Sequence, residues 1–302
     1  INLLKDVRIN NYYPNWPAKF SACKSCEFKK DNSEEAKHKK SGFEHCFKKQ
    51  YNWSETEFKT PSIFNVWDLR DPKLMEQGLL FKSQLTTEDI KYKEVAGRLS
   101  RTERQWLQIE KERENDFSEF VDIENLKEEM ETWVYPLHFI DFETSTVALP
   151  FHTGRKPYEQ IAFQFSHHIY YEDGLIEHAN EYINSTQGEF PNFKFCEKLL
   201  DALNKDEGTI FRYATHENTI LNAIRDQLLA SSYENKESLI SFIETISHPK
   251  NNHTNPWTVP ARKSGKDTRD MVDLCEVIKK YYYNPYTYGS NSIKKVLPAV
   301  LK

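Results

Sequence analysis

Two acidic residues one position apart, Asp141 and Glu143, close a short apolar run that follows Pro136. The run predicts a buried strand, and residues two apart in a strand project from the same face. Two like charges at such short range are costly unless a cation lies between them. Mg²⁺ and Mn²⁺ bind through oxygen ligands, and phosphoryl transfer is often built on such ions. The alternative is an ordinary strand end with two solvated acids.

Two further acids are associated with predicted helices. Residues 209–213 predict a strand that runs into His216 and Glu217, and an apolar helical pattern then continues to Leu229. Asp273 precedes another apolar helix. Each acid has a structural explanation, because the helix macrodipole favours a carboxylate in the first turn and Asp is a good N-cap. The repeated order of strand, acid and helix nevertheless favours one shared site.

The elements that must position these acids alternate after Tyr135. Apolar patterns predict strands at residues 137–142, 160–170, 176–182 and 209–213, helices at 193–203 and 217–229, and a polar turn at 172–174. Hairpin strands followed by alternating helices and strands indicate an α/β domain with a mixed sheet. Residues 247–268 are rich in Asn, Pro, Lys and Thr, which predicts a long loop.

The chain before this domain divides into two parts. Residues 1–60 are rich in Lys, carry three of the five cysteines and predict a small, mainly helical region. Residues 61–134 predict a helical connector, because apolar residues recur at helical spacing between positions 99 and 133. Two helices are expected there, with apolar positions at Trp106, Ile109, Phe117 and Phe120, then at Ile123, Leu126 and Met130. The α/β domain then occupies residues 135–302.

Length and charge limit the class of protein. A chain of 302 residues suffices for one large or two medium domains. The net charge of −5 argues against a generically basic coat for nucleic acid. No apolar run approaches the roughly 20 residues of a membrane span, and no signal peptide is visible, so we expect a soluble, cytoplasmic protein without a membrane partner. The first residue, Ile1, and the helix-like last residues lead us to expect part of a longer chain.

The segments FIDFET at 139–144, PYEQIAFQFS at 157–166 and VDL at 272–274 are distinctive in combination. With the other segments given below, they resemble the DUF2779 family, which is similar to DnaQ-like DEDD exonucleases with a ribonuclease H-like fold. The resemblance covers about residues 135–302. It implies a ribonuclease H-like mixed sheet flanked by helices, with Asp141 and Glu143 in the first exonuclease motif and Glu217 in the second. The segments that carry it are FIDFET at 139–144, PYEQIAFQFS at 157–166 with His168, the strand into Glu217, VDL at 272–274 and YGSNSIKKVLP at 288–298.

The sequence departs from this family pattern in two places. The second motif usually carries Asn where Tyr213 stands and an aromatic residue where His216 stands. The third motif, with the last Asp and its His or Tyr partner, is expected beyond Pro298.

The resemblance implies a metal-dependent 3′-to-5′ exonuclease that acts on single-stranded DNA or RNA with two Mg²⁺ or Mn²⁺ ions. Asp141 would bridge ions about 3.5 to 4 Å apart, Glu143 would hold the ion that carries the attacking water, and Glu217 would hold or orient the shell of the second ion. His216 is a candidate general base or a capping residue. The alternatives are a nucleic-acid-binding module with a degenerate nuclease centre, or a scaffold that docks a partner nuclease.

Basic, aromatic and polar residues near the motifs are candidate substrate contacts. Phosphate contacts and base stacking need these residue types, although a solvated loop explains the basic residues nearly as well. The candidates are Thr144, Arg155, Lys156, Tyr158, His216, Asp273, Ser290 and Lys294, with Arg262, Lys263, Lys266 and Arg269 in the long loop.

The amino-terminal cysteines suggest a second metal site. Cys23 and Cys26 have the spacing of a metal knuckle, and Cys46 follows beside His45. In a reducing compartment such clustering favours a metal over a disulfide, and with His45 or His38 these thiols could complete a tetrahedral zinc site. The CKSCEF segment also resembles the end of a RecB-type nuclease of the CRISPR-associated kind, which implies a [4Fe-4S] cluster with a further cysteine upstream and a nuclease domain there. Free thiols are the alternative, and Cys196 and Cys275 are expected in the core.

Overall fold

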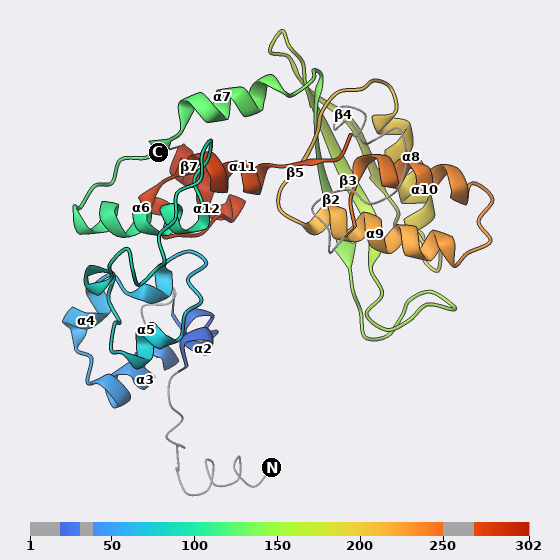
Figure 1. The fold of residues 1–302 in the computed structure, drawn as a ribbon. Coiled ribbons are helices and arrows are strands. Elements are labelled where there is room, and N and C mark those ends of the chain that lie inside the picture. Colours follow the sequence, from blue (N-terminus) through green and yellow to red (C-terminus); the bar gives the residue numbers. More distant parts are fainter. Residues whose placement is uncertain (1–18, 31–38, 250–268, 302) are drawn as a thin grey trace, which may run out of the picture. The chain divides into compact units, whose positions relative to one another are not determined.

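The computed structural model describes residues 19–30, 39–249 and 269–301. The chain divides into two units, one formed by Ile1–Val121 with Tyr282–Lys302 and the other by Asp122–Tyr281 (Figure 1). Each unit has its own hydrophobic core. The boundaries predicted from the sequence near residues 60 and 134 stay predictions, because the two units do not test whether each predicted part folds by itself.

The unit Asp122–Tyr281 is built on a five-stranded mixed sheet with the order β4-β3-β2-β5-β6. Strands β2 (Leu137–Ser145), β3 (Ile161–Tyr170) and β4 (Ile176–Ile183) form an antiparallel meander. Strand β5 (Ile210–Arg212) runs parallel to β2, and β6 (Val272–Asp273) runs parallel to β5. The predicted mixed sheet flanked by helices is confirmed.

Helices α8 (Asn192–Leu203) and α9 (His216–Leu229) pack on the sheet, and α10 (Lys236–Ile246) packs against both of them (Figure 1). They are amphipathic because apolar residues recur every three or four positions, and these side chains form the core with the sheet. The same unit contains α7 (Ile123–Glu131), which packs against α11 (Leu274–Tyr281). The predicted helices at 193–203 and 217–229 are therefore confirmed within one residue.

Strand β2 alternates as the sequence predicts. Ile140 and Phe142 are buried in the core, whereas Asp141 and Glu143 lie on the other face and are exposed. The pairing of β2 with β3 shifts register between Glu143 and Thr144, as at a β-bulge. Bulges change the direction in which side chains point. This one begins directly after Glu143, the second acid of the strand.

The other unit is mainly helical, and a two-stranded antiparallel sheet joins β1 (Phe120–Val121) to β7 (Tyr282–Tyr283). Its core is aromatic, with Phe43 and Phe47 stacked at a centroid distance of 4.4 Å. None of the described helices in either unit combines the length and apolar character needed to cross a bilayer. The helices of this unit are α2 (Phe20–Lys24), α3 (Gly42–Tyr51), α4 (Glu55–Lys59), α5 (Lys73–Glu76), α6 (Arg101–Arg113) and α12 (Ile293–Val300), with short 3₁₀ turns at Ile63–Asn65, Lys82–Gln84 and Pro285–Thr287.

The two helices expected between residues 99 and 133 are α6 and α7, but the first of them is shorter than predicted. It ends at Arg113, because Asn115 adopts a positive φ of 54° and the backbone N–H of Asp116 donates to the carbonyl of Lys111. This closes the helix with a left-handed residue. Phe117 consequently lies outside the helix, and Phe120 belongs to β1.

Candidate functional site

The first two acids lie near the carboxyl end of β2. Asp141 and Glu143 are both exposed, and neither side chain forms a hydrogen bond or an ion pair with another residue in the described ranges. Strand β5 runs parallel to β2 on one side, and α9 begins a few residues after β5 ends. In open α/β sheets ligands bind outside the carboxyl ends of the strands, so these two acids stand where a ligand is expected.

Glu217 is buried in the first turn of α9, with 4% of its surface exposed. Burial, with smaller contributions from the negative charges of Asp141 and Asp273, raises its pKa to about 7, against the lowering effects of its own backbone N–H and of Arg212. Its Oε2 atom is buried without a hydrogen-bond partner in the described structure. An unpartnered buried carboxyl oxygen is rare and costly, so this atom calls for a proton or a cation.

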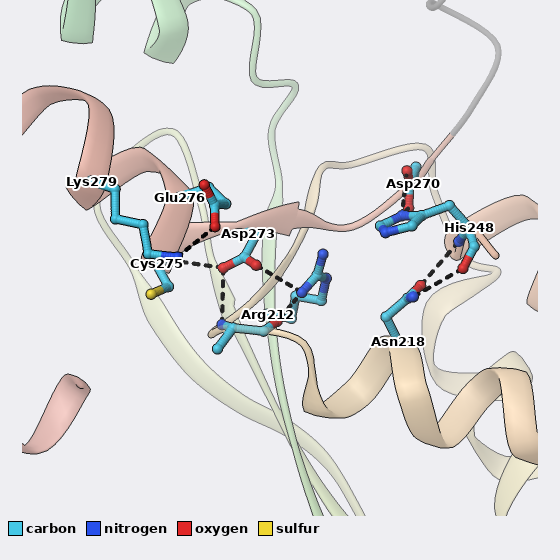
Figure 2. A network of polar contacts seen from close by, with 9 residues as sticks. Arg212, Asn218, His248, Asp270, Asp273, Cys275, Glu276 and Lys279 are labelled. Atoms are coloured by element: carbon cyan, nitrogen blue, oxygen red, sulfur yellow. Dashed lines mark hydrogen bonds and ion pairs between the residues drawn. The ribbon is translucent and has the colours of Figure 1, made fainter. Parts of the chain in front are cut away.

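Asp273 ends β6, and both of its carboxylate oxygens are occupied (Figure 2). Its Oδ1 atom accepts from the backbone N–H groups of Ala214 and Cys275, each at 2.9 Å. Its Oδ2 atom lies 2.9 Å from Nη1 of Arg212 in a buried ion pair. The bond from Cys275 makes Asp273 the N-cap of α11, which is the structural role considered for it from the sequence. A contact between Asp273 and substrate stays a prediction.

Thr144 and His216 connect the end of β2 to the beginning of α9. The Oγ1 atom of Thr144 lies 3.3 Å from Nε2 of His216, and His216 is exposed. The structure therefore brings Thr144 and His216 together, and the charge of Asp141 acts on the neighbouring Glu217. The roles of His216 as a base or of Thr144 as a substrate contact stay predictions.

The acidic side chains do not form a ready-made metal centre. Within residues 19–30, 39–249 and 269–301, no group of three or more His, Cys, Asp or Glu side chains is close enough to hold an ion. The chemistry of the donors nevertheless fits a divalent cation, because the orphaned oxygen of Glu217 is a hard ligand beside a second acid. Asp141 and Glu143 are exposed and unpaired with described residues, so their side chains can rotate toward an ion.

Comparison with protein families matches residues 138–292 to the family described as a domain of unknown function, DUF2779. The chain belongs to this family. The matched segment begins in β2 and includes Asp141, Glu143, Glu217 and Asp273. No curated protein and no solved structure matches the chain.

Within the DUF2779 segment, the connection between β2 and β3 holds three predicted substrate contacts. Arg155 is engaged by its own unit, because its guanidinium lies 3.4 Å from the ring centre of Phe190 and 3.3 Å from Glu159. Glu159 in turn accepts from Gln227, which ties this loop to the last turns of α9 rather than to the turn that carries the buried acid. Lys156 is exposed, so it is available to a ligand.

Tyr158 is the third of these residues. Its backbone has a φ of 59°, its N–H donates to the carbonyl of Val147 at 2.8 Å, and 70% of its surface is exposed. An exposed ring held on a fixed backbone can stack on a base, and its role as a substrate contact stays a prediction.

Ser290 and Lys294 also fall in or directly after the DUF2779 segment, but they belong to the unit that contains Tyr282–Lys302. Lys294 is exposed on α12, and the Oγ atom of Ser290 accepts from the N–H of Ser292 at 3.2 Å. The structure does not place them relative to the acids of the other unit, so their predicted contacts with substrate stay predictions.

The long loop predicted at 247–268 lies mostly outside the described residues, together with Arg262, Lys263 and Lys266. Arg269 directly follows this segment and is a structural residue. Its guanidinium donates to the carbonyl of Leu203 at 2.6 Å and to that of Gly208 at 2.9 Å. Arg269 therefore links the C-terminal end of α8 to the segment just before β5.

Three cysteines of the other unit line one cavity of about 790 Å³, together with apolar residues that include Phe28 and Phe43. Cys23 is buried, and burial raises the pKa of its thiol to about 11, with further contributions from Cys26 and Cys46. These thiols are free, and no described set of three ligands is close enough for a metal. His38 lies outside the described residues, so the zinc or [4Fe-4S] site stays a prediction. Cys196 and Cys275 are buried, as predicted.

Sequence reasoning did not identify a buried polar chain across the core face of the DUF2779 sheet. His138 Nδ1 lies 2.8 Å from His167 Nε2, and His138 Nε2 lies 2.8 Å from Oδ1 of Asp206. Burial lowers the pKa of His167 to about 4, and the neighbouring His138 lowers it further. The alternation of β2 could have shown that His138 faces the core with Ile140, but not which partners it meets there.

Proposed function

We propose that this protein is a metal-dependent nuclease with a ribonuclease H-like domain, and that it removes nucleotides from the 3′ end of single-stranded DNA or RNA. Its acidic centre would consist of Asp141, Glu143 and Glu217. The observation that carries the proposal is the buried carboxyl group of Glu217, which has an unpartnered oxygen and lies under the electrostatic influence of Asp141.

The topology supports the proposed fold. An antiparallel meander of β2, β3 and β4 continues into the parallel strands β5 and β6, with helices packed on the sheet. This arrangement is compatible with a ribonuclease H-like domain. Asp141 and Glu143 on β2 and Glu217 on α9 lie near the carboxyl ends of β2 and β5, where α/β sheets bind ligands, and this supports the proposal.

The acids have separable tasks in this proposal. Asp141 and Glu143 would provide charged oxygens from the exposed face of β2, and Glu217 would provide a buried oxygen from α9. A bound Mg²⁺ or Mn²⁺ would supply Lewis acidity toward the phosphate and would lower the pKa of a water molecule. His216 and Thr144 would orient a substrate group at the rim, since both lie at the point where β2 and α9 meet.

A nucleic-acid-binding module with a degenerate centre is the second candidate. It is favoured by the finding that no three acids of the described chain are arranged to hold an ion. The two candidates differ in one outcome, because a binder retains affinity for oligonucleotides but does not shorten them.

The test uses the full-length protein with 5′-labelled and 3′-labelled single-stranded oligonucleotides, each with Mn²⁺ or with a chelator. We expect mononucleotides from the 3′ end only when Mn²⁺ is present. Asp141→Asn should lower the rate by on the order of 10²-fold or more, as for loss of one electrostatic stabiliser of the transition state.

The matched control is Glu172→Gln, since Glu172 is an exposed acid in the turn between β3 and β4. It should retain the wild-type rate. Binding without cleavage by the wild-type protein would favour the binding module, and full activity of Asp141→Asn would place the active site elsewhere.

A further inference from the structure

We propose that Arg212 and Asp273 are positioning residues that hold the turn between β5 and α9 in the conformation that sets Glu217 beside Asp141. This inference rests on the proposed function, because it explains how one acid of the proposed centre is placed. It assigns to Asp273 a task other than substrate contact.

The turn contains an unusual backbone conformation. Ala214 has a φ of 66°, in the left-handed region that residues with a Cβ atom rarely adopt. It lies three positions before Glu217, between the last residue of β5 and the first turn of α9. The direction in which α9 starts is therefore determined by a residue that needs support from its surroundings.

The support comes from one ion pair (Figure 2). The N–H of Ala214 donates to Oδ1 of Asp273 at 2.9 Å, and the carbonyl of Ala214 accepts from Nη1 of Arg212. Arg212 and Asp273 are themselves 2.9 Å apart and lie opposite each other in the parallel pairing of β5 and β6. Both polar backbone atoms of the left-handed residue are thus held by side chains that bind each other.

The pair is well buried, with 5% of the Arg212 side chain and 9% of the Asp273 side chain exposed. Removing one member would leave the other charge buried without compensation. Both oxygens of Asp273 are occupied by Ala214, Cys275 and Arg212. Three of the roughly four acceptor sites of this carboxylate are thus used within the protein, so the geometry favours a positioning role over a contact with metal or substrate.

The sharpest test is a rescue by glycine. Asp273→Ala should lower kcat by on the order of 10²-fold, with a smaller change in KM, because a displaced catalytic group costs about that much. Glycine adopts positive φ without steric cost. Ala214→Gly in the Asp273→Ala background should therefore restore activity to within about tenfold of the wild type, as expected when a conformational cost is removed.

The alternatives predict other results. If Asp273 contacts metal or substrate, glycine at position 214 gives no rescue, and the positioning role is overturned. If circular dichroism shows that Asp273→Ala does not fold, the rescue by Ala214→Gly is tested in Asp273→Asn instead. This variant keeps an acceptor oxygen at position 273 but loses the ion pair. Glu244→Ala is the matched control, because it removes a partly buried ion pair between Glu244 on α10 and Arg225 on α9, the helix that carries Glu217. It should lower stability without lowering kcat.

A second readout separates this inference from the proposed function. Hydrogen exchange at the Ala214 amide should become at least about tenfold faster in Asp273→Ala, because local opening governs exchange, and should not change in Glu244→Ala. If exchange is faster in Asp273→Ala but the wild-type protein cleaves nothing, the positioning of the turn is retained and the nuclease is rejected. Unchanged exchange would reject the positioning even if the protein is a nuclease.

Discussion

The carboxyl group of Glu217 is buried, and the charge of Asp141 acts on it and raises its pKa. The two acids come from α9 and β2, which meet because β5 lies parallel to β2 and leads directly into α9. Because its pKa is about 7, Glu217 is near the midpoint of its titration at neutral pH in the protein without metal.

The first prediction concerns that titration. The carboxyl carbon of Glu217 should titrate in NMR spectra with a pKa of about 7 in chelator. Asp141→Asn should lower this pKa, because it removes one of the negative charges that disfavour the ionised form. Glu172→Gln should leave it unchanged. A titration of Glu217 in the ordinary range of glutamate would contradict its burial beside the second acid.

The second prediction concerns stability. Glu217 has a folded pKa of about 7, against a usual value of 4.5, so the folded state binds more protons between these values. Its contribution to the unfolding free energy therefore decreases as pH rises from 4.5 to 7. Glu217→Gln should abolish cleavage yet raise the unfolding free energy at about pH 8 by about 1 to 3 kcal/mol, measured by denaturant unfolding in chelator. A loss of stability would indicate that the ionised acid is well compensated.

The third prediction concerns the buried histidine pair, which affects the pH dependence of stability in the direction opposite to that of Glu217. Burial lowers the pKa of His167 to about 4 and also lowers that of His138. Both bind protons less readily in the folded protein than in the unfolded chain, so their contribution to stability is lost as pH falls below the usual value of 6.5, down to about 4 for His167. His167→Gln should flatten this dependence and cost about 1 to 3 kcal/mol at neutral pH through the lost bond to His138.

The control for the histidine pair is His178→Gln, since His178 lies on β4 with nearly half of its side chain exposed. Unfolding curves recorded at a series of pH values should be nearly unchanged by it. An unaltered pH dependence in His167→Gln would show that other groups cause the acid sensitivity.

The fourth prediction concerns the cysteine cavity. If Cys23, Cys26 and Cys46 bind a metal, elemental analysis of protein purified without oxygen should find zinc or iron, and the sulfurs should lie about 2.3 Å from the ion. Cys23→Ser should release it, whereas the neighbouring Ser25→Ala should not. Protein that contains neither metal would leave only a packing role for these thiols.

Much of the sheet follows from local patterns. The alternation of β2 predicts the exposure of Asp141 and Glu143, because side chains in a strand point to opposite faces in turn. The helical spacing of apolar residues predicts α8 and α9 within a residue. The end of α6 was not predicted, since it depends on the left-handed conformation of Asn115, which apolar spacing does not report.

The long-range pairings could not be predicted. Arg212 and Asp273 meet because β5 and β6 are neighbours, and the segment 250–268 between them contains no pattern that specifies this register. The sequence therefore indicates Asp273 as a cap of α11 but not as the acceptor of the Ala214 amide. The burial of Glu217 likewise depends on the packing of α9 on the sheet, which a first-turn acid does not reveal.

The most direct test of the metal centre is the anomalous diffraction of a crystal of the full-length protein grown with Mn²⁺. We expect an ion within about 2.0 to 2.3 Å of oxygens of both Asp141 and Glu217, with the Oε2 atom of Glu217 as one of its ligands. Crystals of Asp141→Asn should lack this ion. A wild-type crystal with no anomalous peak at these two acids, or with a peak only at other residues, would contradict the proposed nuclease centre.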